Sequence, residues 1–130
     1  MSVKALVRPR FAARPPQPSA TPGTWYKIKA QASEDTATLW IYDEIGGWGV
    51  WASDLIAELR QISASRIDVR LNSPGGDVFD GIAIMNALRN HPATVTTYVD
   101  ALAASAASFI AVGGSDKVIM EPQSMMMIHD

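Results

Sequence analysis

Residues 66–99 constrain the fold of this chain more than any other stretch. Apolar and charged residues alternate over 66–71, which is the pattern of a strand with one buried face. Residues 72–77, NSPGGD, give a dense turn signal, residues 78–91 carry apolar side chains at helical spacing, and 93–99 are rich in β-branched and aromatic residues. A strand, a helix and a second strand in this order predict a crossover unit of a parallel sheet.

The flanking segments extend this unit into a larger sheet. Residues 25–30 and 37–42 are typical of a hairpin or of two successive strands, and 117–120 and 125–128 of two short strands. A further helix is expected after the loop that contains Gly46 and Gly47. The element order β-β-α-β-α-β-α-β-β predicts an α/β fold with crossover helices packed on a mainly parallel sheet.

Two of the expected helices are amphipathic, and each is expected to bury one stripe. The first has Ser53 as a plausible N-cap and Asp54 in its first turn. Its apolar stripe consists of Leu55, Ile56, Leu59 and Ile62. The second helix has Asp77 or Asp80 near its positive end. Its apolar stripe consists of Val78, Ile82, Met85 and Leu88.

Composition limits the classes to which the chain can belong. Its 130 residues, 48% of them hydrophobic, suffice for one soluble domain with a real core. The absence of cysteine excludes a disulfide framework, a thiolate zinc site and a cysteine nucleophile, and no apolar run reaches the roughly 20 residues of a membrane span. Without clustered metal ligands or a phosphate loop, we expect no metal and no cofactor. A cytoplasmic location fits these features.

Charge divides the chain at about residue 23. Residues 1–23 carry four basic and no acidic side chains, together with five prolines, which predicts a solvated, disordered arm. Residues 24–130 form the expected folded domain and carry seven basic and thirteen acidic residues, a net charge of −6. An acidic domain argues against nucleic acid as a partner.

The segment 101–114, ALAASAASFIAVGG, sets Ser105 and Ser108 into an apolar run of small residues and is expected to form a helix. One explanation is tight helix packing, in which a serine hydroxyl bonds to the carbonyl four residues earlier. The other is a nucleophile near the positive end of a helix. This second explanation requires a base and oxyanion donors close by.

Two loops are placed to supply such groups. In open α/β sheets the functional crevice forms at the carboxyl ends of the strands. Here the loop 72–77 follows one strand, and residues 100–104, expected as the joint before Ser105, follow the next. Gly75 and Gly76 allow backbone N–H groups to point outward. Together with the N–H of the residue after a nucleophilic serine, they can form an oxyanion hole.

The chain offers two histidines as bases. His91 precedes Pro92 near a helix end, which is typical of a solvated residue at the negative end of a helix. His129 follows the apolar residues 125–128 and is expected at a strand end. It is either a core or edge histidine or, paired with Ser105 and the glycine loop, a general base.

Three segments together carry a family resemblance. NSPGGD at 72–77, ALAASAASFIAVGG at 101–114 and PQSMMMIHD at 122–130 resemble, in order and spacing, the proteolytic subunit of Clp-type serine proteases. The resemblance runs from about Thr38 to the last residue. It implies a ClpP/crotonase-like fold.

The resemblance also implies roles for individual residues. Ser105 corresponds to the nucleophile and His129 to the general base, while Ser108 has no matching role. The implied oxyanion donors are the backbone N–H groups of Gly75, Gly76 and Ala106. The resemblance implies as partners a polypeptide substrate and, for the full-length protein, other copies of the chain in a homo-oligomeric ring. It also allows a separate ATP-dependent unfoldase as a partner.

Residues 39–62 resemble a particular branch, the phage and prophage head maturation proteases, which trim capsid and scaffold proteins. Leu102 and Ala107 stand where housekeeping members usually carry glycine, and they fit the phage branch without excluding a housekeeping peptidase. Two further alternatives stay open at this point. One is a crotonase-like acyl-coenzyme A enzyme that uses the glycine loop, and the other is a non-catalytic ring or assembly subunit.

The aspartate that completes the family's triad has no evident match. Asp130 is adjacent to His129, so on a strand its side chain points to the opposite face. Asp77 and Asp100 correspond to no family position. We therefore expect an N-terminal portion of a longer protease or a truncated product that lacks the C-terminal part of the fold. Such a chain is expected to have little peptidase activity.

Overall fold

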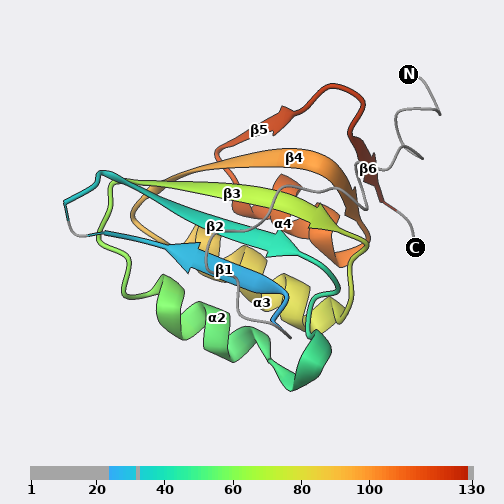
Figure 1. Cartoon of the computed structure of the whole chain (residues 1–130), viewed down its shortest axis with the longest axis horizontal. Helices are drawn as coiled ribbons and strands as arrows, with labels where there is room; N and C mark the ends of the chain where they lie inside the picture. Colours follow the sequence, from blue (N-terminus) through green and yellow to red (C-terminus); the bar gives the residue numbers. More distant parts are fainter. Residues whose placement is uncertain (1–23, 32, 129–130) are drawn as a thin grey trace.

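The computed structural model describes residues 24–31 and 33–128 (Figure 1). The arm 1–23 and the candidate base His129, together with Asp130, lie outside the described residues. The expected order of strands and helices is confirmed, with one short 3-10 helix in addition. The elements are β1 (Tyr26–Lys29), β2 (Thr36–Tyr42), η1 (Gly47–Gly49), α2 (Ala52–Leu59), β3 (Arg66–Ser73), α3 (Val78–Arg89), β4 (Thr94–Ala104), α4 (Ala106–Gly114), β5 (Lys117–Met120) and β6 (Met125–Met127).

The strands form one mainly parallel sheet, as the sequence predicts. Their order is β1-β2-β3-β4-β5, and β6 pairs with the last residues of β4. Only the β1–β2 pair is antiparallel among the described strands. Because β3 and β4 are parallel neighbours, the loop after β3 and the end of β4 meet at the same edge of the sheet.

Helices α2, α3 and α4 all lie on one face of this sheet (Figure 1). In β3 the residues facing the helices, Ile67, Val69 and Leu71, are completely buried, whereas the intervening side chains stay partly exposed on the opposite face. Burial of each apolar side chain contributes about 1.5–3 kcal/mol to folding. The alternation therefore fixes which face of β3 meets the helices and which face stays open.

The expected helix cap and the expected buried stripe of α2 are partly wrong. The helix starts at Ala52 with Trp51 at the N-cap, and Ser53 is exposed within the first turn. The Trp51 N–H donates to Asp54 Oδ2 at 3.3 Å, so the carboxylate in the first turn takes part of the role assigned to Ser53. Leu55 and Leu59 are buried as expected, Ile56 only partly, and Ile62 is buried beyond the end of the helix.

The buried face of α3 differs from the expected stripe. Val78 and Ile82 are exposed to 45% and 37%, and the buried residues are Gly81, Ile84 and Leu88. A Cβ added at Gly81 would lie 2.8 Å from the Cβ of Ala106, so α3 packs tightly against α4 at a residue without a side chain. The expected stripe consists only of large apolar residues, so it does not include a contact that a glycine makes. The expected acidic residue near the positive end of α3 is confirmed: Asp80 lies in the first turn, and Asp77 is the N-cap, whose carboxylate accepts from the Asp80 N–H at 2.8 Å.

The alanine-rich segment is a helix only from Ala106 onward. The expectation that residues 101–104 form a joint or the start of this helix is wrong, because β4 continues through Ala104. Ala103 is paired on one side with Ser73 of β3 and on the other with Met126 of β6. These neighbouring strands supply the hydrogen-bond partners of a strand and override the helical preference of alanine. The Ala-rich stretch thereby carries Ser105 to the edge of the sheet.

Candidate active site

Ser105 occupies the sharp turn between β4 and α4. Its backbone has φ 55° and ψ −122°, a conformation that non-glycine residues rarely adopt. Its N–H donates to the carbonyl of Met127 at 2.9 Å, which ties the turn to the end of β6. A strained strand-to-helix turn of this kind presents a serine hydroxyl at the edge of a sheet, in front of a helix N-terminus.

Gly75 lies directly against this turn. A Cβ added at Gly75 would lie 2.8 Å from the carbonyl oxygen of Ala104 and 2.9 Å from the Cβ of Ser105. The φ of Gly75 is +107°, which other residues adopt only with strain. Glycine is therefore required at position 75 for two reasons, the positive φ and the lack of room for a Cβ.

Gly76 lies where the loop is hydrogen-bonded to the segment after β2. The Ile45 N–H donates to the carbonyl of Gly75 at 2.7 Å, and the Asp77 N–H donates to the carbonyl of Ile45 at 3.1 Å. A Cβ added at Gly76 would lie 2.2 Å from the Ile45 carbonyl oxygen. The loop is thus held as a short extra parallel bridge, which leaves little freedom for the backbone around Gly76.

The three N–H groups expected as oxyanion donors are engaged differently. The Gly75 N–H donates to Ser73 Oγ at 3.1 Å. The N–H groups of Gly76 and Ala106 donate to no group within the described part of the chain. Free N–H groups beside a serine are the donors that an oxyanion can use. Of the three expected donors, only Gly75 has its N–H engaged by another group of the described residues.

Ser73 is a residue that the sequence interpretation counted only as part of a turn. It is completely buried, and its hydroxyl donates to the carbonyl of Asp43 at 2.6 Å while accepting from Gly75. Its position two residues before Gly75 was a usable signal, because serine hydroxyls commonly bond to the backbone two residues on. The backbone of Ile45 bonds to the glycine loop, but nothing in the sequence indicated this contact.

We expect Ser73→Ala to destabilise the chain by about 2 kcal/mol, since it leaves the buried Gly75 N–H and Asp43 carbonyl without this hydroxyl. Chemical denaturation of the variant and the wild type measures the difference. Ser65→Ala is the matched control, because the Ser65 hydroxyl also bonds to a loop carbonyl and carboxylate, those of Asp35, but is solvent-accessible. Equal stability of Ser73→Ala and the wild type would contradict the assigned contacts.

The remaining residues considered from the sequence are placed as follows. Ser108 is completely buried, and its hydroxyl donates to the carbonyl of Ser105 at 2.5 Å, three residues back rather than four. His91 accepts at Nδ1 from the Ala93 N–H at 3.0 Å, at the opposite end of β4 from Ser105. Asp77 caps α3, and Asp100 pairs with Arg70. Neither aspartate is therefore free to orient a histidine beside Ser105.

Within residues 24–31 and 33–128, no group of three or more metal-ligating side chains occurs. No helix in that part of the chain has the length and apolar character needed to cross a membrane. The arrangement around Ser105 consists of a hydroxyl, two free N–H groups and a helix N-terminus. Such a set suits nucleophilic attack on a carbonyl whose oxygen becomes negatively charged.

Comparison with known proteins agrees with this geometry. The family model described as Clp protease matches residues 25–130. The ATP-dependent Clp protease proteolytic subunit of Pleurastrum terricola is 45% identical over 62 residues, which cover 47% of this chain and 32% of the relative. The corresponding subunit 2 of Corynebacterium diphtheriae is 35% identical over 83 residues, covering 60% of this chain and 42% of the relative. The chain thus spans well under half the length of these relatives.

Solved structures show the same likeness. A ClpP1 variant from Listeria monocytogenes superposes with a TM-score of 0.63 at 28% identity, covering 71% of this chain and 55% of the other. The ClpP protease catalytic domain of Plasmodium falciparum gives 0.61 at 32% identity, covering 69% and 53%. An enoyl-CoA hydratase from Shewanella pealeana also gives 0.61, covering 81% and 49%, but at 11% identity, so it shares the fold alone. The expected ClpP/crotonase-like fold is confirmed.

Proposed function

The chain belongs to the Clp protease family, and on that basis we propose that it forms the nucleophile-bearing part of a serine endopeptidase. The observation that carries this proposal is the placement of Ser105. Its strained turn lies against Gly75, and the N–H groups of the next residues, Gly76 and Ala106, donate to no group of the described residues. A buried packing serine needs none of these features, whereas a nucleophile needs all of them.

The proposed reaction is acyl transfer. Ser105 Oγ attacks the carbonyl carbon of a peptide bond, and its proton passes to the imidazole of His129. The carbonyl oxygen becomes an oxyanion, which the N–H groups of Gly76 and Ala106 stabilise. The imidazolium then gives the proton to the leaving amine, which departs and leaves an acyl-enzyme. Water, deprotonated by the same imidazole, releases the acid and restores Ser105.

Support for His129 comes from the strand that precedes it. The last residues of β6 run parallel to the end of β4, and Met127 accepts the Ser105 N–H. His129 is the second residue after Met127 and remains a proposal, since it lies outside the described residues. Asp77 and Asp100, the two described aspartates considered for orienting it, are engaged elsewhere.

Within the family we propose the head maturation branch of phages and prophages. Residues 39–62, together with Leu102 and Ala107, support this branch, and the substrates would be capsid or scaffold polypeptides. We also propose that the full-length protein assembles into a ring in the host cytoplasm or the prohead. The alternative is a housekeeping role beside a separate ATP-dependent unfoldase. Digestion of capsid and scaffold proteins would distinguish the two roles.

Reaction with a fluorophosphonate tests the nucleophile directly. We expect the wild-type chain to form one covalent adduct, located on Ser105 by peptide mass spectrometry, and Ser105→Ala to form none. The rate is expected to be lower by up to about 10⁴-fold than in an enzyme whose histidine is oriented by an aspartate, because Asp77 and Asp100 are both engaged elsewhere.

Ser108→Ala is the matched control. It removes a hydroxyl one helical turn away, and the Ser105 carbonyl keeps a second donor, the Ser108 N–H at 2.9 Å. The control is expected to label like the wild type. Labelling of the wild type no greater than that of Ser105→Ala would overturn the proposal in favour of a non-catalytic subunit. Turnover of an acyl-coenzyme A by Ser105→Ala would favour a crotonase-like enzyme.

A further inference from the structure

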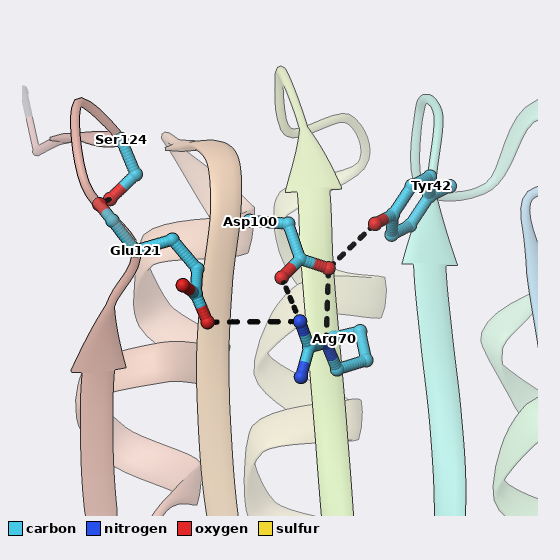
Figure 2. Close-up of polar contacts among 5 residues, drawn as sticks. All are labelled: Tyr42, Arg70, Asp100, Glu121 and Ser124. Carbon is cyan, nitrogen blue, oxygen red and sulfur yellow. Dashed lines mark hydrogen bonds and ion pairs between the residues drawn. The ribbon is translucent and has the colours of Figure 1, made fainter. Parts of the chain in front are cut away.

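The open face of the sheet carries a polar cluster centred on Arg70, which the proposed chemistry does not use. Arg70 Nε donates to Asp100 Oδ2 at 3.1 Å, and its terminal NH₂ group donates to Asp100 Oδ1 at 2.6 Å, so the pair is bidentate. Asp100 Oδ2 also accepts from the hydroxyl of Tyr42 at 2.6 Å. Figure 2 shows these contacts in front of the sheet, with the helices behind.

Arg70 also reaches the segment after β5. Its NH₂ group lies 3.8 Å from Glu121 Oε1 (Figure 2). Its guanidinium carbon lies 4.4 Å from the centre of the Tyr98 ring. Burial alone would lower the pKa of Arg70, but its hydrogen bonds to Asp100 outweigh that and raise the pKa above its usual value. The guanidinium therefore stays charged while it contacts two carboxylates on two neighbouring segments.

Both carboxylates stand at points where the chain leaves a regular strand. Leu71 pairs with Val99, but Ser73 pairs with Ala103, so β4 carries two extra residues in the stretch that begins with Asp100. Such an irregularity re-aims the strand that follows. Asp100 thus marks the place where β4 turns toward the serine.

Glu121 marks the beginning of the turn between β5 and β6. Its N–H donates to the carbonyl of Val99 at 3.1 Å, and its carbonyl accepts from both the N–H and the hydroxyl of Ser124 at 3.0 and 2.7 Å. This turn sets the position of Met125–Met127, the strand whose last carbonyl holds the Ser105 N–H.

We propose that Arg70 is a positioning residue that clamps the irregular part of β4 to the β5–β6 turn. The clamp holds β6 beside the end of β4 and so fixes the serine turn through the Ser105–Met127 bond. Its catalytic consequence rests on the function proposed above, because only then does the strand carry a base to Ser105. The clamping of β6 itself does not depend on catalysis.

Hydrogen exchange measured by NMR tests the clamp in the whole chain. In Arg70→Met we expect the Ser105 N–H to exchange about tenfold faster or more, the factor that loss of a charge-assisted pair produces. Amides of the edge strand β1 are expected to keep their exchange rates, because β2 separates this strand from β3 and Arg70. Lysine keeps the positive charge but lacks the planar guanidinium that makes the pair with Asp100 bidentate. Arg70→Lys is therefore expected to restore part of the protection of the Ser105 N–H from exchange.

The fluorophosphonate reaction gives the second measurement. Arg70→Met is expected to lower the labelling rate at saturating reagent by about tenfold. The reagent concentration for half-maximal rate should stay unchanged, because Arg70 is not proposed to touch the reagent. Arg66→Met is the matched control on the same face of β3, since the Arg66 side chain forms no ion pair with any residue that the structure describes.

Unchanged exchange of the Ser105 N–H in Arg70→Met would overturn the clamp. Equal acceleration of all amides would also overturn it, since that result indicates only lower global stability. If the wild type fails to label while Arg70→Met still exposes the Ser105 N–H, the clamp stands and the proposed function falls. If the wild type labels and Arg70→Met labels equally fast, the catalytic consequence of the clamp is wrong.

Discussion

Replacing Gly75 with alanine is expected to slow the fluorophosphonate labelling of Ser105 by about 100-fold or more, the size of effect seen when an oxyanion donor is lost. The added Cβ would lie 2.8 Å from the carbonyl oxygen of Ala104 and 2.9 Å from the Cβ of Ser105. Neither atom belongs to the end of a flexible side chain, so either the glycine loop or the serine turn must move. Movement of the loop separates the Gly76 N–H from Ser105.

Gly47→Ala is the matched control for this variant. A Cβ at Gly47 would find its nearest neighbour at 3.9 Å, and the backbone there has no positive φ, so labelling is expected to stay at the wild-type rate. Thermal unfolding of both variants separates a local effect from a global one. Wild-type labelling by a folded Gly75→Ala variant would show that the loop does not assist Ser105.

The position of the site was predictable because it depends on connectivity. When a strand is followed by a glycine loop, a helix and a second strand, the two strands are expected to be parallel neighbours in the sheet. The carboxyl ends of two such strands lie at the same edge of the sheet. Gly75 is therefore expected beside Ser105, and the distances at that glycine agree with this expectation. The serine-bearing helix was also expected from 101–114, although it begins later, at Ala106.

The errors arose where contacts distant in sequence outweigh local preference. Residues 101–104 favour a helix by composition, but β3 and β6 both pair with Ala103 and hold the segment as a strand. The buried face of α3 was misassigned because Gly81, without a side chain, forms the contact. Arg70 alternates with apolar neighbours and looked like an ordinary solvent-facing residue, since nothing near it in sequence indicated its pairing with Asp100.

The structural likeness to an enoyl-CoA hydratase shows how little the fold alone says about chemistry. A similar sheet and helix layer supports enzymes that act on different substrates. The features that distinguish the proposed serine peptidase from a crotonase-like enzyme in this chain are local. They are a serine at a strained turn and the strand β6, whose last residue accepts the N–H of that serine. Experiments that perturb these contacts are therefore more informative than further comparison of folds.

Gly81→Leu is expected to be the most destabilising of the substitutions considered, with a loss of about 3 kcal/mol in the free energy of unfolding. A Cβ at Gly81 would lie 2.8 Å from the Cβ and 3.2 Å from the carbonyl oxygen of Ala106, and leucine adds three more carbons to that contact. Leucine favours a helix over glycine by about 1 kcal/mol, so a net loss can come only from the steric conflict between α3 and α4.

Thermal unfolding measures this effect as a fall of roughly 10–20 °C in Tm. Asn86→Leu is the matched control, because it places the same side chain at an exposed position of α3 and is expected to leave Tm nearly unchanged. The folded fraction of Gly81→Leu should also label slowly at Ser105, since α4 carries the Ala106 N–H away with it. A Tm equal to or above that of the wild type would mean that the two helices do not meet at Gly81, and the position of the Ala106 donor would then need another support.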